Sequence, residues 1–139
     1  MRYMMVMIPN VSPEQWAEGP SAEMAAAMNR YNEELTRAGV LLALDGLHPL
    51  SEGARVSFGA DAKPTVTDGP FTEAKEVIGG YWVIQARSKE EAVEWARRIP
   101  AAPGDTVEVR RVYEFSDHDP EVQEVSKLSA TPPEQTVAS

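Results

Sequence analysis

The chain has 139 residues, the size of a single domain, and its hydrophobic content of 42% is sufficient for a folded core. Its 13 basic and 22 acidic residues give a formal net charge of −9, which argues against nucleic acid or an anionic membrane surface as a partner, because phosphate groups require a basic face. The chain contains no cysteine, which excludes disulfides, thiolate chemistry and Cys-based zinc sites.

The N-terminal stretch MRYMMVMIPN is apolar but too short for the apolar region of a signal peptide. No segment approaches the ~18 apolar residues of a membrane span, so we expect a soluble, cytoplasmic protein. Residues 1–8 are predicted to form a strand that is apolar on both faces, which is typical of a central strand covered on both sides. The spacing of Ser12, Pro13 and Gln15 then predicts a capping box and a one-turn helix.

A longer amphipathic helix is expected from Ser21 to a glycine cap at Gly39, with Met24, Met28, Tyr31 and Leu35 on one stripe. Further elements follow in chain order: a strand from 40 ending near Asp45-Gly46, a hairpin of strands 55–58 and 64–67, a strand at 80–86, a helix from Ser88 to Pro100, and a last strand at 106–115. Beyond residue 116 we expect a tail, residues 117–139, with a short helix after Asp119-Pro120 and a disordered end.

This order of elements predicts an α+β fold, a ferredoxin-like βαββαβ protomer with a hairpin insert in one domain at residues 1–116. Both crossovers are right-handed, so both helices cover the same face of the sheet. Because the first strand is apolar on both faces, the other face requires a cover. We therefore expect a homodimer formed through the sheet.

The stretch DGPFTEAKEVIGGYWVIQARSKEEAVEWARRIP, together with the N-terminal MRYM, LHP at 47–49 and VEVRRV at 107–112, resembles the DGPF proteins of the YciI-like (YCII-related) family. The resemblance covers most of residues 1–115 and implies a dimeric α/β barrel. It also implies a neighbourhood of extracytoplasmic-function sigma factors, and some relatives are small-molecule enzymes that use a His–Asp pair. Those relatives carry the histidine on the first helix, where this chain has Asn29, Tyr31 and Asn32 instead.

In the last predicted strand, Arg111 shares a face with Val107 and Val109 and so lies among apolar neighbours. A buried arginine must be paired, because an unpaired buried charge costs several kcal/mol. The partner is either a carboxylate, such as Asp68 or Glu73, or an anionic ligand held in bidentate fashion. The simpler alternatives are a structural ion pair elsewhere, or a bulge that turns Arg111 to solvent.

Two interpretations apply to Asp68 and the loop that follows it. Asp-Gly-Pro is turn chemistry, and the charged residues after it then form a solvated loop of little energetic weight. The alternative is a loop over the mouth of the barrel, which presents Asp68, Phe71 and Lys75 to a ligand.

Three further positions are candidates for chemistry. His48 follows Asp45 by three residues in a loop, and histidine is the usual group for proton transfer near neutral pH, although most loop histidines are surface residues. Tyr81 and Gln85 lie on the mixed face of their strand, where a ligand is expected. We expect no metal site, since Asp117-His118-Asp119 is an exposed tail segment.

Two functions remain open on the sequence alone. The first is a small-molecule-binding dimer with cofactor-free acid–base catalysis on a polar or aromatic metabolite, in which Asp68, His48 or Asp45 moves protons. Arg111, Lys75, Phe71, Tyr81, Gln85 and Tyr31 then contact the ligand. The second is a non-catalytic regulatory module with a sigma-factor partner, which the acidic surface and the missing helix histidine favour.

Overall fold

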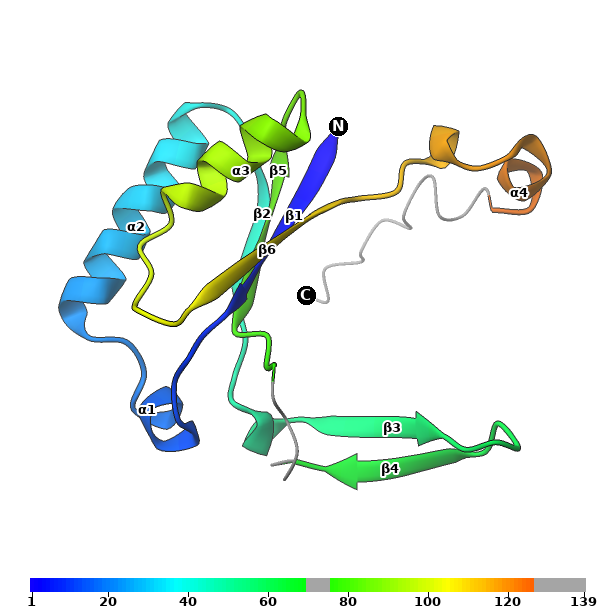
Figure 1. Ribbon diagram of the computed structural model, residues 1–139, viewed down its shortest axis with the longest axis horizontal. Coiled ribbons are helices and arrows are strands. Elements are labelled where there is room, and N and C mark those ends of the chain that lie inside the picture. Colours follow the sequence, from blue (N-terminus) through cyan, green and yellow to red (C-terminus); the bar gives the residue numbers. More distant parts are fainter. Residues whose placement is uncertain (70–75, 127–139) are drawn as a thin grey trace, which may run out of the picture.

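The computed structural model describes residues 1–69 and 76–126, which fold as an α+β domain with antiparallel sheets (Figure 1). The strands are β1 (Arg2–Ile8), β2 (Leu41–Gly46), β3 (Ala54–Phe58), β4 (Pro64–Asp68), β5 (Gly80–Gln85) and β6 (Thr106–Arg111). The α-helices are α1 (Pro13–Glu18), α2 (Ala22–Arg37), α3 (Lys89–Arg97) and α4 (Pro120–Val125), and two short 3-10 helices span Leu50–Glu52 and Phe115–Asp117.

Serine caps begin the first three helices. Ser12 forms the expected capping box with Gln15, while the Ser21 and Ser88 side chains accept hydrogen bonds from the third residue after each of them. Helix α2 ends at Arg37 with Ala38 as its C-cap, and Gly39 follows with a φ of 72°, the left-handed conformation that glycine adopts without strain. The predicted starts of these helices are therefore confirmed.

The main sheet has the strand order β2-β5-β1-β6, and all three neighbouring pairs are antiparallel. Helices α2 and α3 lie on the same face of this sheet, as expected (Figure 1). The core lies between the helices and the sheet. Its members are Tyr3, Met5, Tyr31, Leu35, Trp82, Ile84, Ala86, Ala92 and Ile99.

The opposite face of the sheet, here called the open face, carries no helix in the part of the chain that the structure describes (Figure 1). Cross-strand partners lie on the same face, so the register assigns its residues. They are Ala43 and Asp45 of β2, Tyr81, Val83 and Gln85 of β5, Arg2, Met4, Val6 and Ile8 of β1, and Thr106, Glu108 and Arg110 of β6. Beyond Arg2, the first strand is therefore apolar on both faces, as the sequence predicts.

Strands β3 and β4 pair with each other as a separate two-stranded sheet, here called the arm (Ala54–Asp68). The arm extends from one end of the main sheet, on the side away from α2 and α3 (Figure 1). All residues of both strands are exposed. The predicted hairpin strands are thus present, and they lie outside the core.

The last strand ends at Arg111, earlier than predicted, and the prediction of a strand to residue 115 is wrong. Two ion pairs hold the segment that follows, here called the C-terminal turn (Val112–His118). Arg2 donates two hydrogen bonds to Glu114, at 2.8 and 3.1 Å, and Arg111 lies 2.7 Å from Asp117. The short helix α4 follows as expected, and the predicted disorder of residues 127–139 lies outside the described residues. Within the described ranges, no helix is long and apolar enough to cross a bilayer.

Candidate functional site

A hollow of about 420 Å³ lies on the open face. Its apolar part comes from Met4, Val6 and Ile8 of β1, with Ile78 and Val112 beside them, and its charged part comes from Glu76, Glu108, Arg110 and Arg111. A volume of this size is in the range of small-molecule sites, which typically measure about 300–1,000 Å³. The open face therefore offers an apolar surface with a few charged groups at its border.

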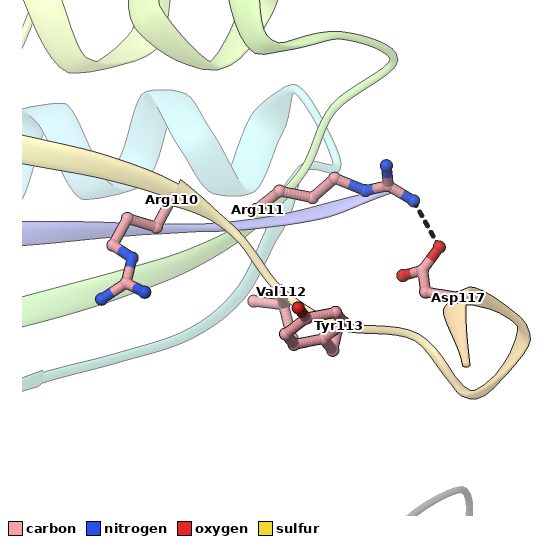
Figure 2. Close-up of a pocket in the computed structure, with 5 residues that line it drawn as sticks. All are labelled: Arg110, Arg111, Val112, Tyr113 and Asp117. Atoms are coloured by element: carbon pink, nitrogen blue, oxygen red, sulfur yellow. Dashed lines mark hydrogen bonds and ion pairs between the residues drawn. The ribbon is translucent and has the colours of Figure 1, made fainter. Parts of the chain in front are cut away.

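Arg110 and Arg111 leave β6 in different directions (Figure 2). Arg110 pairs in register with Met4 of the open face, and no carboxylate pairs with its side chain among the described residues. Arg111 is opposite Tyr3, on the face of the helices, and its half-exposed guanidinium is bound to Asp117. Arg111 therefore shares a face with Val107 and Val109, as predicted, and its partner is Asp117, which agrees with the alternative of a structural ion pair.

A second hollow, of about 360 Å³, adjoins the first and shares Arg110, Arg111 and Val112 with it (Figure 2). Tyr113 and Asp117 of the C-terminal turn complete its border. The ring of Tyr113 is stacked on His118, with centroids 5.2 Å apart. The end of β6 thus borders both hollows, and Arg110 is the cation there whose guanidinium has no ion-pair partner among the described residues.

Asp45 and Tyr81, two of the predicted site residues, are brought together on the open face. They are cross-strand partners of β2 and β5, and the Tyr81 hydroxyl donates a hydrogen bond of 2.9 Å to Asp45 Oδ2. The hydrogen bond and the negative charge of Asp45 raise the pKa of the Tyr81 phenol. Tyr81 is also the register partner of Val6, which lines the larger hollow, so the pair lies next to it.

The other residues predicted on β5 and α2 separate into two groups. Gln85 is exposed on the open face, opposite Arg2. Tyr31 is only 4% exposed, and its hydroxyl donates to the carbonyl of Trp95 at 2.7 Å. It packs edge-on against Trp82 in the core. Tyr31 is therefore a core residue and not a ligand contact, because its polar atom already has a partner between the two helices.

Asp68 and His48 lie apart from the Asp45–Tyr81 pair. Asp68 ends β4, opposite Ala54 at the base of the arm, and lines neither hollow. His48 is exposed in the loop after β2, and among the described residues no hydrogen bond joins it to Asp45. The spacing of three residues between Asp45 and His48 thus does not produce a dyad here.

Phe71 and Lys75 lie outside the described residues. Glycines fix the chain on both sides of that segment. A Cβ at Gly69 would lie 1.8 Å from the carbonyl oxygen of Leu50, and one at Gly80 would lie 2.9 Å from that of Asp45. The glycine of the Asp-Gly-Pro turn is therefore required by close packing, in agreement with the turn interpretation of this residue.

A smaller hollow of about 180 Å³ lies where β2 ends and β5 begins. Its lining includes Met7, Met28 and Leu44, the backbone around Gly46, Gly79 and Gly80, and the polar residues Asn32, Asp45, Tyr81 and Trp82. The indole N–H of Trp82 donates to Asn32 Oδ1 at 2.8 Å. Asn32 thus satisfies a buried donor of the core.

The described residues contain no group of three or more side chains suited to hold a metal ion. Glu108 and Arg110 were not predicted as site residues, because the prediction placed the ligand-binding cation of β6 on the face that carries Arg111. The alternation itself contained the signal. Val107 and Val109 pack against the core, so Glu108 and Arg110, one residue out of step, had to be on the open face.

Comparisons with known proteins give a family and two similar chains. Residues 1–116 match the family model of the YCII-related domain. Uncharacterized protein R00369 of Rhizobium meliloti (strain 1021) is 28% identical over 91 residues, which are 66% of this chain and 73% of that protein. The 5-chloro-2-hydroxyhydroquinone dehydrochlorinase TftG of Burkholderia phenoliruptrix AC1100, solved with 2,5-dihydroxybenzoquinone, is similar with a TM-score of 0.43 and 16% identity, over 86% of this chain and 100% of that one.

Proposed function

The chain belongs to the YCII-related domain family, and we propose that it is a homodimer that binds a polar or aromatic small molecule on the open face. In this proposal the second copy covers the open face, and the ligand acts as substrate for cofactor-free acid–base chemistry. The observation that carries the proposal is the hydrogen-bonded Tyr81–Asp45 pair beside the hollow of about 420 Å³. Ligand sites of this kind combine apolar walls with a few convergent polar groups.

Arg110 is the proposed anchor for a carboxylate or a phenolate of the ligand. Its guanidinium is always charged, and its fork of N–H donors matches a carboxylate in bidentate fashion. Tyr81 is on β5 and Arg110 is on β6, with β1 between them. Neighbouring strands lie ~4.8 Å apart, so these two strands are roughly 10 Å apart. A single-ring ligand with one anionic substituent spans this separation, with its ring over Met4 and Val6.

The Tyr81–Asp45 pair is the proposed acid–base group. A tyrosine phenol is protonated at neutral pH, and Asp45 raises the pKa of Tyr81 further, so its hydroxyl is a hydrogen-bond donor for a ligand oxygen. When the hydroxyl turns to the ligand, the Asp45 carboxylate loses its donor and accepts a proton from the substrate instead. The two other residues predicted to move protons, Asp68 and His48, have no assigned step in this scheme.

A thermal-shift screen tests the binding proposal. We would use a panel of hydroxylated and carboxylated single-ring aromatics, and we expect a subset to stabilise the wild-type protein. A ligand at a hundred times its dissociation constant adds about 2.7 kcal/mol to stability. Arg110→Gln should weaken binding of the hits at least tenfold. Asp45→Asn should abolish turnover, which is measured by the change in absorbance of the ligand, while binding persists.

Arg97→Gln is the control, because it removes the same charge from α3, on the covered face of the sheet, and Arg97 lines neither hollow. Binding by this variant should stay within about twofold of wild type if the ligand lies on the open face. Equal loss in both variants, or no shift with any compound, would overturn the proposal. The alternative with a sigma-factor partner has no support from the family match or from the similar proteins.

A further inference from the structure

One face of the arm is apolar from its middle to its outer end, with Ala54 and Asp68 at its base. The register pairs Val56 with Val66 and Phe58 with Pro64, so these four side chains lie on the same face of the ribbon. Val56, Phe58 and Val66 are 53%, 68% and 66% exposed. The other face carries Arg55, Ser57, Thr65 and Thr67. The arm is therefore a two-sided ribbon with a polar side and an exposed hydrophobic side.

The arm has little support from its own chain. Among the described residues, β3 and β4 pack extensively against each other, and neither packs extensively against any other helix or strand. An isolated two-stranded hairpin is only marginally stable in water, and stability requires a further strand or a packed hydrophobic face. Three large apolar side chains on one face of such a ribbon indicate a surface that is covered when the protein is assembled.

The position of the arm indicates what covers it. The arm leaves one end of the sheet toward the side of the open face, and the C-terminal turn and α4 lie on that same side (Figure 1). A body that packs on the open face therefore lies beside the arm as well. In a two-fold dimer each copy gives one arm and receives one, because the interface is isologous.

The areas agree with this arrangement. Strands of six or seven residues make the open face ~20 Å long and ~19 Å wide, about 400 Å² of sheet. A standard stable interface buries about 800 Å² on each partner, so the sheet alone provides about half. An arm of five residues on each strand adds a surface of ~170 Å², and receiving the arm of the other copy adds the same again.

We propose that the arms are exchanged: the apolar face of each arm, formed by Val56, Phe58, Pro64 and Val66, packs against the second copy of the chain. This inference rests on the dimer of the proposed function, but not on its ligand or its acid–base pair. The arm then forms the outer part of the interface, and the sheet forms its centre.

The absence of cysteine from the sequence allows a direct test, because one introduced thiol can be labelled selectively. A benzophenone maleimide is attached to Phe58→Cys in the full chain and activated with light. We expect covalent dimers as the main product. The matched control is Ser57→Cys, the adjacent residue on the polar face of the same strand, which should give few covalent dimers.

Sedimentation supplies the second measurement. The double variant Phe58→Ser with Val66→Ser should raise the dimer dissociation constant at least tenfold, because each arm loses large apolar side chains from the interface. Ser57→Ala with Thr65→Ala should leave it unchanged within about twofold. Circular dichroism checks that the main sheet and helices persist in both variants.

The outcomes separate this inference from the proposed function. A monomeric wild-type protein would overturn both the dimer and the exchange of arms. Two results would overturn the exchange of arms alone, if the wild-type protein is a dimer. In the first, the label on Phe58→Cys reacts within its own chain. In the second, the double variant dimerises as tightly as wild type. Loss of ligand binding in the screen, with covalent dimers still formed through position 58, would overturn the ligand site alone.

Discussion

Asp45 sets the ionisation of Tyr81 through a single hydrogen bond across two strands. Both the hydrogen bond and the negative charge oppose the formation of a phenolate, so they raise its pKa. We expect Asp45→Asn to lower the pKa of Tyr81 toward the ordinary value of a tyrosine. The ultraviolet absorbance of tyrosinate, followed during an alkaline titration, measures it. Tyr81→Phe identifies which step of the titration belongs to this residue, and an unchanged step in Asp45→Asn would contradict the assignment.

The buried phenol of Tyr31 makes the stability of the fold decrease as the pH rises into the alkaline range. Burial is the main cause of its raised pKa, because the charged phenolate would lose its hydration between α2 and α3. A group whose pKa is raised on folding stabilises the protein fully below its unfolded pKa, about 10, and this contribution disappears as the pH rises through the folded value.

The corresponding prediction concerns Tyr31→Phe. At neutral pH the variant should lose about 1 kcal/mol of stability, since the hydrogen bond from the Tyr31 hydroxyl is removed and the carbonyl of Trp95 keeps only the backbone N–H of Arg98 as donor. Above about pH 10 the difference from wild type should shrink, because the variant has no phenol to ionise. Urea unfolding between about pH 7 and pH 11 measures both effects, with the exposed Tyr113→Phe as the control. A constant difference across this range would contradict the role of burial.

Among the elements, the C-terminal turn depends most directly on charge. The hydrogen bonds from Arg2 lower the pKa of Glu114, and the positive charge of Arg2 acts in the same direction. A lowered carboxyl pKa contributes stability above the unfolded value of about 4.3, and that contribution is lost as the pH falls through the folded value. The turn should therefore detach from β1 at acid pH while the sheet is still folded.

Hydrogen exchange is the measurement for this prediction. At neutral pH the amide of Val112, which donates to the carbonyl of Arg2, should be protected in wild type and less protected in Glu114→Gln. On acidification the wild-type amide should lose protection and the variant should change little. Glu121→Gln on α4 is a control of the same charge change in the neighbouring helix. Equal pH dependence in wild type and Glu114→Gln would show that another group controls the turn.

The junction of the arm with the main sheet depends on a glycine. A methyl group at Gly69 would overlap the carbonyl of Leu50, so Gly69→Ala requires a shift of the backbone at the base of the arm. We expect a cost of about 1–3 kcal/mol, the usual range for overpacking, and a lower melting temperature. Gly46→Ala is the control, since a Cβ there meets nothing within 4 Å. Equal melting temperatures for the two variants would mean that the junction has room for a side chain.

At the scale of the whole molecule, the fold was largely predictable because local signals agree with each other. The serine caps at Ser12, Ser21 and Ser88 and the alternation of β1 each depend on neighbouring residues only. The end of β6 was not predictable in this way. The ion pair that fixes the turn joins Arg2 to Glu114, which are 112 positions apart in the chain, and no local pattern reports such a contact.

The geometry of the candidate site depends on a β-bulge in β2, which the sequence pattern does not predict. The pairing of β2 with β5 shifts between Leu41 and Ala43, which leaves Leu42 as an extra residue. A shift of one residue moves every following side chain to the other face. Without this bulge Leu44 would be opposite Tyr81, and Asp45 would point to the other side of the sheet. Asp45 and Tyr81 were each predicted as site residues, but their hydrogen bond could be predicted only with knowledge of the strand register.

The glycines around the smaller hollow restrict how this protein can change over generations. A Cβ at Gly79 would lie 2.9 Å from Pro9, and a Cβ at Gly80 would be equally close to the carbonyl of Asp45. Mutational drift therefore cannot fill the hollow from Gly79 or Gly80 without displacing Pro9 or the main chain at Asp45, whereas Gly46 has room for a Cβ. Descendants of this sequence that acquire a different ligand range at that end of the sheet should differ instead at Met7, Met28 and Leu44, the flexible or apolar side chains of the lining.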